Sequence, residues 1–593
     1  MKRTVSILCI VSGLFLLGCE SKPGQAPVAE TPEAGPHPTL QWILACRSGM
    51  EGFGWFPGDS AFTGTTGMAL EALADLGALE SFPGKDELVR WLKARQQADG
   101  GFIEKVDYYG KGINLPWGTQ SALEPTFWAV RALNLLGARP DRPEAAAAFI
   151  AKRQTDNGAF EAFEYARDAV KVATYSTFWA VAALKELGLP VPDSAKVVEW
   201  VRDQQNTIDR RGGFALSPDG FYFSSTQGTY YAVATLALLG AGPERPVEVK
   251  RFLLSTHGQE ANGGFELGHG DNWNNHDHFS RLKDTFCGVS ALRLLGMPLS
   301  DSDTSRAARP AGDCAAWIGS VQNPDGGFSR FGATTQTPLL TPSEMMATCQ
   351  AVRTLTLLGR PVPRPAEPQP PAEKMDIPPM QHRHPGIDFD DPVEVWAFRR
   401  IAVPIYDKYL RETGSQIAAI GMLSRWVREA TGPENQAADR HIEGRKALMH
   451  GWGQCGTMSW LLQTLSASVD HPARGAYVFG DANCEVLVRE KEWDKPHWIC
   501  YIPFTNEYVD PEMPAPDGTR NGWSALDLVI DHDLRVRDYI YESKTILGDH
   551  RYWRVWIEAI NDTSGAWGED LRIDTTMNYT SPAALALYPG GSW

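Results

Sequence analysis

The stretch that decides the fold runs from residue 97 to residue 137 and reads QADGGFIEKVDYYGKGINLPWGTQSALEPTFWAVRALNLLG. It opens on a turn in which two glycines precede Phe102, and it closes on an apolar run that ends at Gly137. The apolar residues of that run recur at helical spacing, and a glycine directly after such a run is typical of a left-handed helix C-cap. The stretch therefore predicts a tight turn followed by a buried helix.

The helical part of this stretch recurs along the first 360 residues. Each copy is rich in alanine, has apolar residues at helical spacing and ends in a glycine. Recurrence at an interval of fifty to sixty residues is the mark of a repeat architecture. The copies span residues 64–77, 124–137, 175–188, 227–240, 283–296 and 346–359.

The glycine-rich turn also recurs, and an amphipathic run such as residues 87–92 precedes it. The repeating unit is therefore helix, turn, helix. We expect the paired glycines to adopt backbone angles that other residues resist, and the aromatic residue after them to fill the gap between neighbouring helices. The turns lie at residues 97–102, 154–160, 205–214, 259–265 and 322–328.

Six helical hairpins with a Gln-x-x-Asp-Gly-Gly-Phe turn resemble the α/α toroid of protein prenyltransferase β-subunits, squalene-type cyclases and complement-like thioester domains. The resemblance implies an all-α (α/α)6 toroid over residues 38–362. It implies little about chemistry, because the repeated residues build the ring and activity belongs to other residues that line it.

The reactive motifs of these families do not recur in the repeats. Residues 281–287 depart from the zinc-binding spacing of prenyltransferases, and the Asp-x-Asp-Asp of cyclases occurs only at 388–391, beyond the last repeat. Residues 46–50 do not supply a thioester segment. We therefore expect no metal and no cofactor, and we interpret the histidine-rich loop at 269–278 as solvated.

The N-terminus reads as an export signal, with two basic residues before an uncharged run that ends in Leu16-Leu17-Gly18-Cys19. This ending resembles the lipobox of bacterial lipoproteins, and the resemblance implies a signal peptide over residues 1–18 and acylation of Cys19. Residues 19–37 are polar and proline-rich, so we predict a disordered tether. The protein would then be anchored to a membrane of the cell envelope and exposed to the periplasm or exterior.

The charge of the chain argues against nucleic acid as a partner. The 593 residues carry a formal net charge of −16, with 43% hydrophobic and 22% charged residues. Binding to phosphate backbones needs a basic surface, whereas these values are those of an acidic globular protein.

A second domain follows a proline-rich linker at residues 363–386. From residue 387 to 593 the glycine-rich turns stop, a helical stretch at 415–428 precedes four short aromatic and β-branched runs, and an extension follows them. Helices before strands indicate an α+β domain. Cys484 and Cys500 fall near adjoining strands, where they could pair or simply pack.

Three residues of this domain form a candidate catalytic triad. Cys455 directly precedes a helical run, and a thiol at a helix N-terminus is favoured as thiolate. His497 starts a strand, and Asp510 ends the next one, so a hairpin could place the carboxylate beside the imidazole. The amide of Cys455, with Gln454 or Trp452, would stabilise an oxyanion.

The order of these segments resembles the transglutaminase core, whose fold is papain-like. The matching segments are Gly453-Gln454-Cys455, Pro472-Ala473-Arg474, His497-Trp498 and Val509-Asp510-Pro511. The resemblance implies Cys455 as nucleophile, His497 as base and Asp510 as the residue that orients the base. The charged segment at 489–496 and the tryptophan after His497 depart from the family pattern.

The sequence thus predicts an envelope lipoprotein whose second domain hydrolyses an amide of a protein or peptide, or passes its acyl group to an amine, while the toroid binds. Two alternatives remain: a non-catalytic envelope scaffold, and a terpenoid-binding or prenyltransferase-like toroid. The sequence leaves the oligomeric state open.

Overall fold

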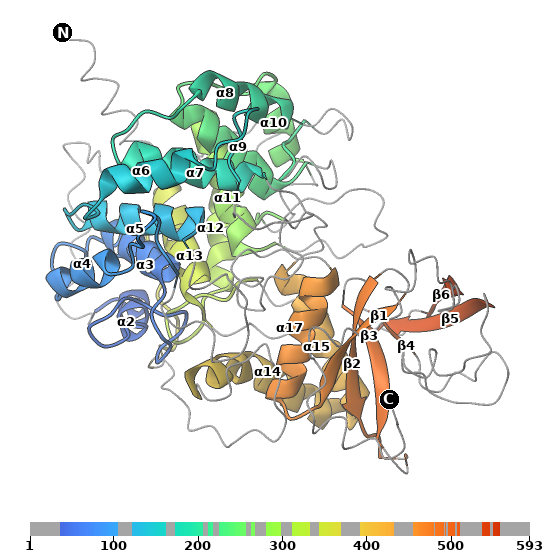
Figure 1. The fold of residues 1–593 in the computed structure, drawn as a ribbon. Coiled ribbons are helices and arrows are strands. Elements are labelled where there is room, and N and C mark those ends of the chain that lie inside the picture. Colours follow the sequence, from blue (N-terminus) through green and yellow to red (C-terminus); the bar gives the residue numbers. More distant parts are fainter. Residues whose placement is uncertain are drawn as a thin grey trace, which may run out of the picture. The chain divides into compact units, whose positions relative to one another are not determined.

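The chain folds into two compact units, Met1–Ala333 with Leu340–Lys374, and Thr334–Leu339 with Met375–Trp593. Figure 1 shows their helices and strands in sequence colours. The computed structural model describes residues 36–104, 121–161, 172–205, 212–216, 224–255, 263–266, 280–297, 311–331, 343–368, 370, 392–431, 455–478, 481–491, 493, 496–503, 507–509, 537–545 and 550–557.

A closed ring of six inner helices forms the first unit. Each helix packs against the next along the chain, and the last packs against the first. All six are 13 residues long and bury almost their whole circumference, which explains why the repeats are apolar on every side. They are α3 (Thr63–Asp75), α5 (Leu123–Leu135), α7 (Thr174–Glu186), α9 (Thr226–Leu238), α11 (Leu282–Leu294) and α13 (Met345–Leu357).

Shorter, amphipathic helices form the outer layer and precede the inner helices one by one. The predicted α/α toroid is therefore confirmed for the described residues of this unit (Figure 1). The outer helices are α2 (Pro38–Ala45), α4 (Lys85–Lys93), α6 (Pro143–Ala151), α8 (Ser194–Asp203), α10 (Pro246–Leu253) and α12 (Ala311–Ser320).

The glycines that close the inner helices have the predicted left-handed conformation. Their φ angles lie between 67° and 74°, and an added Cβ would meet nothing within 4 Å, so backbone conformation alone selects glycine there. They are Gly77, Gly137, Gly188, Gly240, Gly296 and Gly359.

One hydrogen bond ties every turn to the inner helix that follows it. In each turn the buried phenylalanine N–H donates to the hydroxyl of the threonine at the fourth position of that helix. The bond is 2.9–3.2 Å long in all six repeats. The pairs are Phe53–Thr66, Phe102–Thr126, Phe160–Thr177, Phe214–Thr229, Phe265–Thr285 and Phe328–Thr348.

The turn at Gly52-Phe53, which is the first along the chain, lacks the Gln-x-x-Asp-Gly-Gly pattern. The sequence repeat therefore identifies only the other five turns. Four of the other turns have two adjacent glycines, which differ in role, whereas Ala159 takes the second place in the turn at 154–160. The first glycine has positive φ, as at Gly100 (φ 96°), whereas the second leaves room for an aromatic ring of the next outer helix. A Cβ on Gly101 would lie 2.6 Å from the ring of Phe149.

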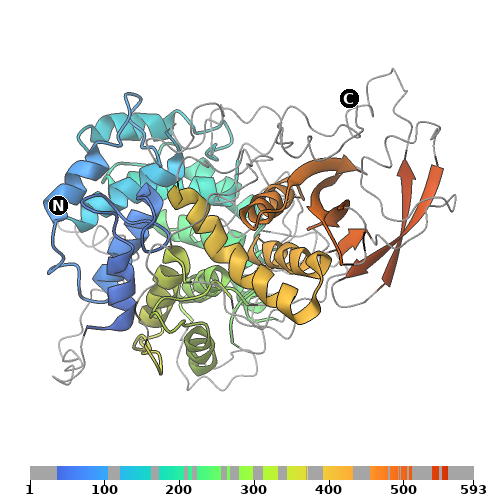
Figure 2. The ribbon, with the colours of Figure 1, turned by 90° about the horizontal axis from the view of Figure 1, so that it is seen from below.

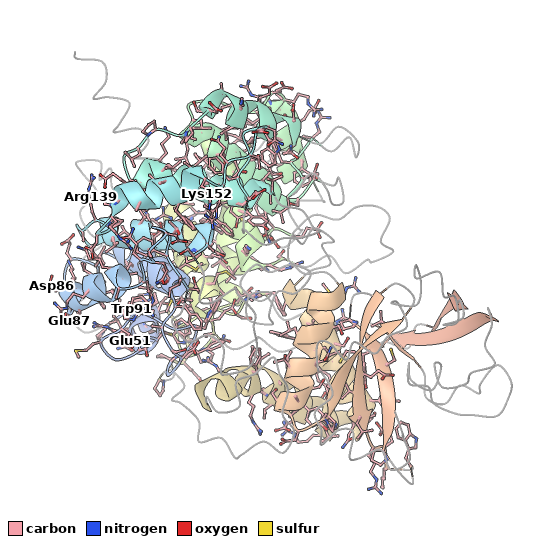
Figure 3. The ribbon with its side chains drawn as sticks, in the orientation of Figure 1. Glu51, Asp86, Glu87, Trp91, Arg139 and Lys152 are labelled. Carbon is pink, nitrogen blue, oxygen red and sulfur yellow. The ribbon has the colours of Figure 1, made fainter. Side chains whose placement is uncertain are left out.

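Trp91 of α4 occupies the equivalent position beside Gly52, and the guanidinium of Arg95 stacks on its indole at 3.4 Å. Figure 3 labels Trp91 together with Asp86 and Glu87, which form the acidic first turn of α4. Carboxylates there complement the helix dipole.

The first helix of the unit closes the ring. A Cβ on Gly327, in the last turn, would lie 2.7 Å from the indole of Trp42 in α2, which is the contact made by Gly101 and Phe149 in the second repeat. The Trp42 indole N–H donates to Asp325 over 3.1 Å, and Thr39 donates to the carbonyl of Gly326 over 2.7 Å. Helix α2 therefore serves as the outer helix that follows α12.

The second unit begins with three helices, and its strands follow them, in the order that the sequence predicts. Helix α14 packs against the other two, α17 packs on strands β1 and β2, and α15 contacts β3 (Figures 1 and 2). The helices are α14 (Pro392–Thr413), α15 (Gln416–Thr431) and α17 (Cys455–Ser468).

Six antiparallel strands form one sheet in which each strand pairs with the next. A buried His471 joins helices to sheet: its Nδ1–H donates to the carbonyl of Leu487 over 2.9 Å, and its Nε2 accepts from the Tyr406 hydroxyl over 2.6 Å. The strands are β1 (Ala473–Val478), β2 (Asp481–Val488), β3 (His497–Ile502), β4 (Glu507–Val509), β5 (Arg537–Thr545) and β6 (His550–Ile557).

The turn-to-helix bond can be tested on α13. Thr348→Val keeps the side-chain shape but leaves the buried N–H of Phe328 without an acceptor, so we expect the toroid to lose about 1–3 kcal/mol of unfolding free energy. Thr356→Val is the matched control, because the Thr356 hydroxyl donates only to the Val352 carbonyl of the same helix. Urea unfolding measures the free energy of unfolding of both variants. Equal losses in the two variants would contradict the role assigned to Thr348.

Candidate functional site

Aromatic side chains from four consecutive inner helices meet inside the ring and form what we call the aromatic layer. Phe127 of α5 contacts Phe178 of α7, with ring centroids 5.9 Å apart. Phe178 in turn lies 5.4 Å from Tyr231 of α9, and Tyr230 lies 5.4 Å from Phe286 of α11. Aromatic pairs at these separations attract one another beyond their buried area.

The charged residues that influence the pKa of Tyr230 indicate that this layer faces the ring interior. Burial raises the pKa of Tyr230 far above its ordinary value, and Cys287 and Glu71 raise it further while Arg353 lowers it. Glu71 lies on α3, which is opposite α9 in a ring of six. A side chain of α9 can interact with α3 only through the interior.

An ion-pair layer lies beyond the aromatic layer, toward the C-terminal ends of the inner helices. Arg131 of α5 bridges Glu71 of α3 and Glu186 of α7, at 2.9 Å each. Arg353 of α13 binds Asp75 of α3 at 3.1 Å. Burial raises the pKa of Asp75, and Arg353 opposes that rise. The layer joins four of the six inner helices, so we assign it to stability.

A polar cluster lies at the N-terminal ends of inner helices α9 and α11, and we call it the Gln227–Asp284 cluster. The Gln227 amide donates to Asp284 over 2.7 Å, and the Arg281 guanidinium lies 3.6 Å from the second carboxylate oxygen. Lys283, next to Asp284 on α11, also belongs to the cluster. Burial lowers the pKa of Lys283 to about 8, although interactions with Cys287, Asp284 and Glu124 raise it.

Glu124 locates the cluster within the ring, because it lies on α5, opposite Lys283 on α11. Burial also raises the pKa of Asp284, which Arg281 and the Gln227 hydrogen bond partly offset. The sequence offered one usable sign of this cluster. Gln227, Lys283 and Glu124 are polar residues at the second position of their inner helices, which holds Gly64, Tyr175 and Met346 in the other three repeats.

Buried thiols inside the ring stay protonated. Burial raises the pKa of Cys287 well above that of an ordinary thiol, although Lys283 opposes the rise, and the pKa of Cys349 is raised in the same way. Among the described residues, no group of three or more His, Cys, Asp or Glu side chains could hold a metal ion. The histidine-rich loop at 269–278 lies outside them.

Two residues of the predicted triad begin elements of the second unit. Cys455 is the first residue of α17 and His497 is the first residue of β3, as the sequence predicts for both. Asp510 is the residue after β4 in the chain. It lies outside the described residues, and so do Gln454, Trp452 and Cys19. Strands β3 and β4 pair with Tyr501 opposite Tyr508.

Cys484 and Cys500 are both buried, and neither forms a disulfide among the described residues. Cys484 pairs with Tyr501 across β2 and β3, whereas Cys500 pairs with Glu485, so the two cysteines point to opposite faces of the sheet. They pack rather than form a disulfide.

The fold and interior define the class of protein: a closed α/α toroid. The family model of the prenyltransferase alpha-alpha toroid domain matches residues 4–108, 118–178, 167–334 and 271–369, which is more than half of the chain. The chain therefore belongs to this family. A comparison with curated proteins gives no match.

Two solved structures are similar to part of the chain. Candida albicans protein geranylgeranyltransferase-I complexed with GGPP is 16% identical, with a TM-score of 0.36, covering 50% of this chain and 83% of its own. The type II terpene cyclase MstE from Scytonema is 15% identical, with a TM-score of 0.36, covering 54% of this chain and 96% of its own. Within the described part of the chain, no helix is both long and apolar enough to cross a membrane.

The depressed pKa of Lys283 makes stability depend on pH. Below pH 8 the lysine is charged in the folded and unfolded chains, so the cost of its burial is present in full. From about pH 8 to 10.5 the folded chain loses this proton first, so its free energy of unfolding rises.

We therefore expect Lys283→Met to be more stable than the wild type at pH 7, and this advantage to shrink between pH 8 and 10.5. Urea unfolding at a series of pH values measures the difference. Lys196→Met, at a half-exposed lysine of α8, should reproduce the pH dependence of the wild type. A constant advantage of Lys283→Met would refute the assignment.

Proposed function

We propose that the toroid binds an elongated apolar ligand of the isoprenoid class along its interior. The observation that carries this proposal is the aromatic layer, which is continuous from α5 to α11 and is flanked by polar layers on both sides. Aromatic walls with few polar groups are typical of sites for apolar ligands. Membership in the prenyltransferase toroid family supports the same ligand class.

Recognition is the role that we propose for the ring, rather than turnover. Its interior thiol Cys287 is held protonated by burial, which disfavours a thiolate nucleophile or metal ligand there. The Asp-x-Asp-Asp segment at 388–391 belongs to the second unit and lies outside the described residues. Any chemistry would then fall to the second unit.

Farnesene, a C15 isoprenoid hydrocarbon, tests this proposal by quenching of tryptophan fluorescence in the full chain. Phe178→Leu interrupts the aromatic layer between α5 and α9, so we expect roughly tenfold weaker binding, from a loss of about 1.4 kcal/mol. Phe149→Leu changes a buried aromatic residue of outer helix α6 and should bind as the wild type does. Equal affinity of the two variants, or no binding by the native chain, would rule the interior out as the site.

We infer a second function for the other unit: acyl transfer through the thiol of Cys455. Its specific support is that α17 begins at Cys455, where the helix dipole favours a thiolate. Strand β4 pairs with β3, which begins at His497, and β4 ends at Val509, directly before Asp510 in the chain. The resemblance to transglutaminases assigns these three residues as nucleophile, orienting carboxylate and base.

In this reaction the Cys455 thiolate attacks the carbonyl carbon of an amide in a protein or peptide, and the His497 imidazolium protonates the leaving amine. The acyl group then passes from sulfur to water or to an amine. Asp510 would hold the imidazole in the required tautomer, and Gln454 or Trp452 would help to stabilise the oxyanion.

Alkylation by iodoacetamide tests the thiol. We expect Cys455 to be labelled at pH 6–7, well below the pKa of about 8.5 of an ordinary thiol, and His497→Ala to move this labelling to higher pH. Cys455→Ser should abolish it. The buried Cys484, whose pKa burial raises, serves as an internal control in the same peptide map. Labelling of Cys455 only above pH 8.5 would leave the second unit as a recognition domain.

We further propose that Cys19 is acylated and that its lipid anchors the protein in the bacterial cell envelope. The support is the lipobox-like Leu16-Leu17-Gly18-Cys19. A short tether would then separate the membrane from α2, the helix that closes the ring.

A further inference from the structure

We propose that the Gln227–Asp284 cluster binds the hydroxyl group of an uncharged, alcohol-type isoprenoid, and that it discriminates against the corresponding diphosphate. This inference rests on the proposed function, since it names the headgroup of the ligand whose apolar part lies in the aromatic layer.

Two buried acceptor atoms in the cluster have no hydrogen-bond partner among the described residues: Gln227 Oε1 and Asp284 Oδ2. Both residues are 0% exposed. The orientation of the Gln227 amide is set by its other bond, because only its nitrogen can donate to Asp284 Oδ1 over 2.7 Å. Buried acceptors that lack a donor are uncommon in folded proteins and need an explanation, which a bound donor group would supply here.

A hydroxyl group can bind in either protonation state of Asp284, and it satisfies both atoms when the carboxyl is protonated. It can donate to Gln227 Oε1 while it accepts from a protonated carboxyl, or donate to the ionised carboxylate. Burial raises the pKa of Asp284, so the protonated form becomes accessible as the pH falls. A carbonyl or ether group cannot donate and would leave Oε1 unsatisfied.

The cations around the cluster already face carboxylates. Arg330 forms a two-pronged pair with Glu344, at 2.9 and 3.0 Å, and Arg281 lies 3.6 Å from Asp284. Lys283 interacts with Asp284 and Glu124. A diphosphate would have to displace these carboxylates or bring its own charge next to them, and buried like charges repel strongly. A neutral headgroup adds no charge.

The cluster lies about one helical turn from the aromatic layer, where the head of such a ligand would follow its apolar part. Gln227 precedes Tyr230 and Tyr231 by three and four residues on α9, so they share one helix face about one turn apart. On the opposite helix, Glu124 faces the cluster and Arg131 belongs to the ion-pair layer. Seven residues of helix separate these two, or about 10 Å along the axis.

Three ligands with the same carbon skeleton test the inference on the full chain: farnesol, farnesyl diphosphate and farnesene. We expect farnesol to bind at least tenfold more tightly than farnesene, and farnesyl diphosphate to bind more weakly than farnesol. Tryptophan quenching measures all three. Farnesene binding alone reports on the proposed function, so failure of the headgroup site is distinguishable from failure of the ring as a binding module.

Gln227→Leu removes the unsatisfied acceptor, so it should weaken farnesol binding about tenfold and leave farnesene binding unchanged, which also shows that the variant is folded. Gln204→Leu, at a half-buried glutamine directly after outer helix α8, is the matched control and should change the binding of neither ligand. Asp284→Asn should likewise reduce the preference for the alcohol. Equal affinity of the native chain for farnesol and farnesene, or tighter binding of the diphosphate, overturns the inference.

Discussion

The hydrogen bond from each turn phenylalanine to a threonine of the next inner helix is the constraint on which the toroid depends. A turn that passes between two layers of helices buries its backbone, and a buried N–H needs an acceptor. The threonine hydroxyl supplies that acceptor at the same helix position in all six repeats. Each bond fixes one inner helix against its outer partner, and repetition of this geometry curves the chain into a ring.

Closure of the ring depends on contacts between the ends of the repeat region. Trp42 of α2 bonds to Asp325, 283 residues later in the chain, and fills the space beside Gly327. His37, just before α2, contacts the carbonyl of Val362 over 3.1 Å. The segments that lead into and out of the ring therefore meet at this junction. No covalent link is needed, because the first outer helix makes the contacts that every outer helix makes with the preceding turn.

The function that we propose arises where the repeats differ from one another. Threonine, alanine and the closing glycine recur because they build the ring, whereas the inward positions hold aromatic residues in the middle of four helices and charged or amide residues nearer the helix ends. Aromatic side chains gather in one layer, and charges gather at its two ends, one end satisfied by ion pairs and the other with unsatisfied acceptors. The two ends of the ring interior therefore differ, and a bound ligand would have one preferred orientation.

The sequence by itself determined the repeat, the helix ends and the turns, because glycine conformation and apolar spacing act within a few residues of the chain. It also placed Cys455 at a helix start and His497 at a strand start, which local patterns signal. The turn at Gly52-Phe53 and the interior cluster of Lys283, Asp284 and Gln227 were decided only by tertiary structure. Their partners come from helices that lie far apart in the chain, and a residue's pairing across a closed ring leaves no mark on its sequence neighbours.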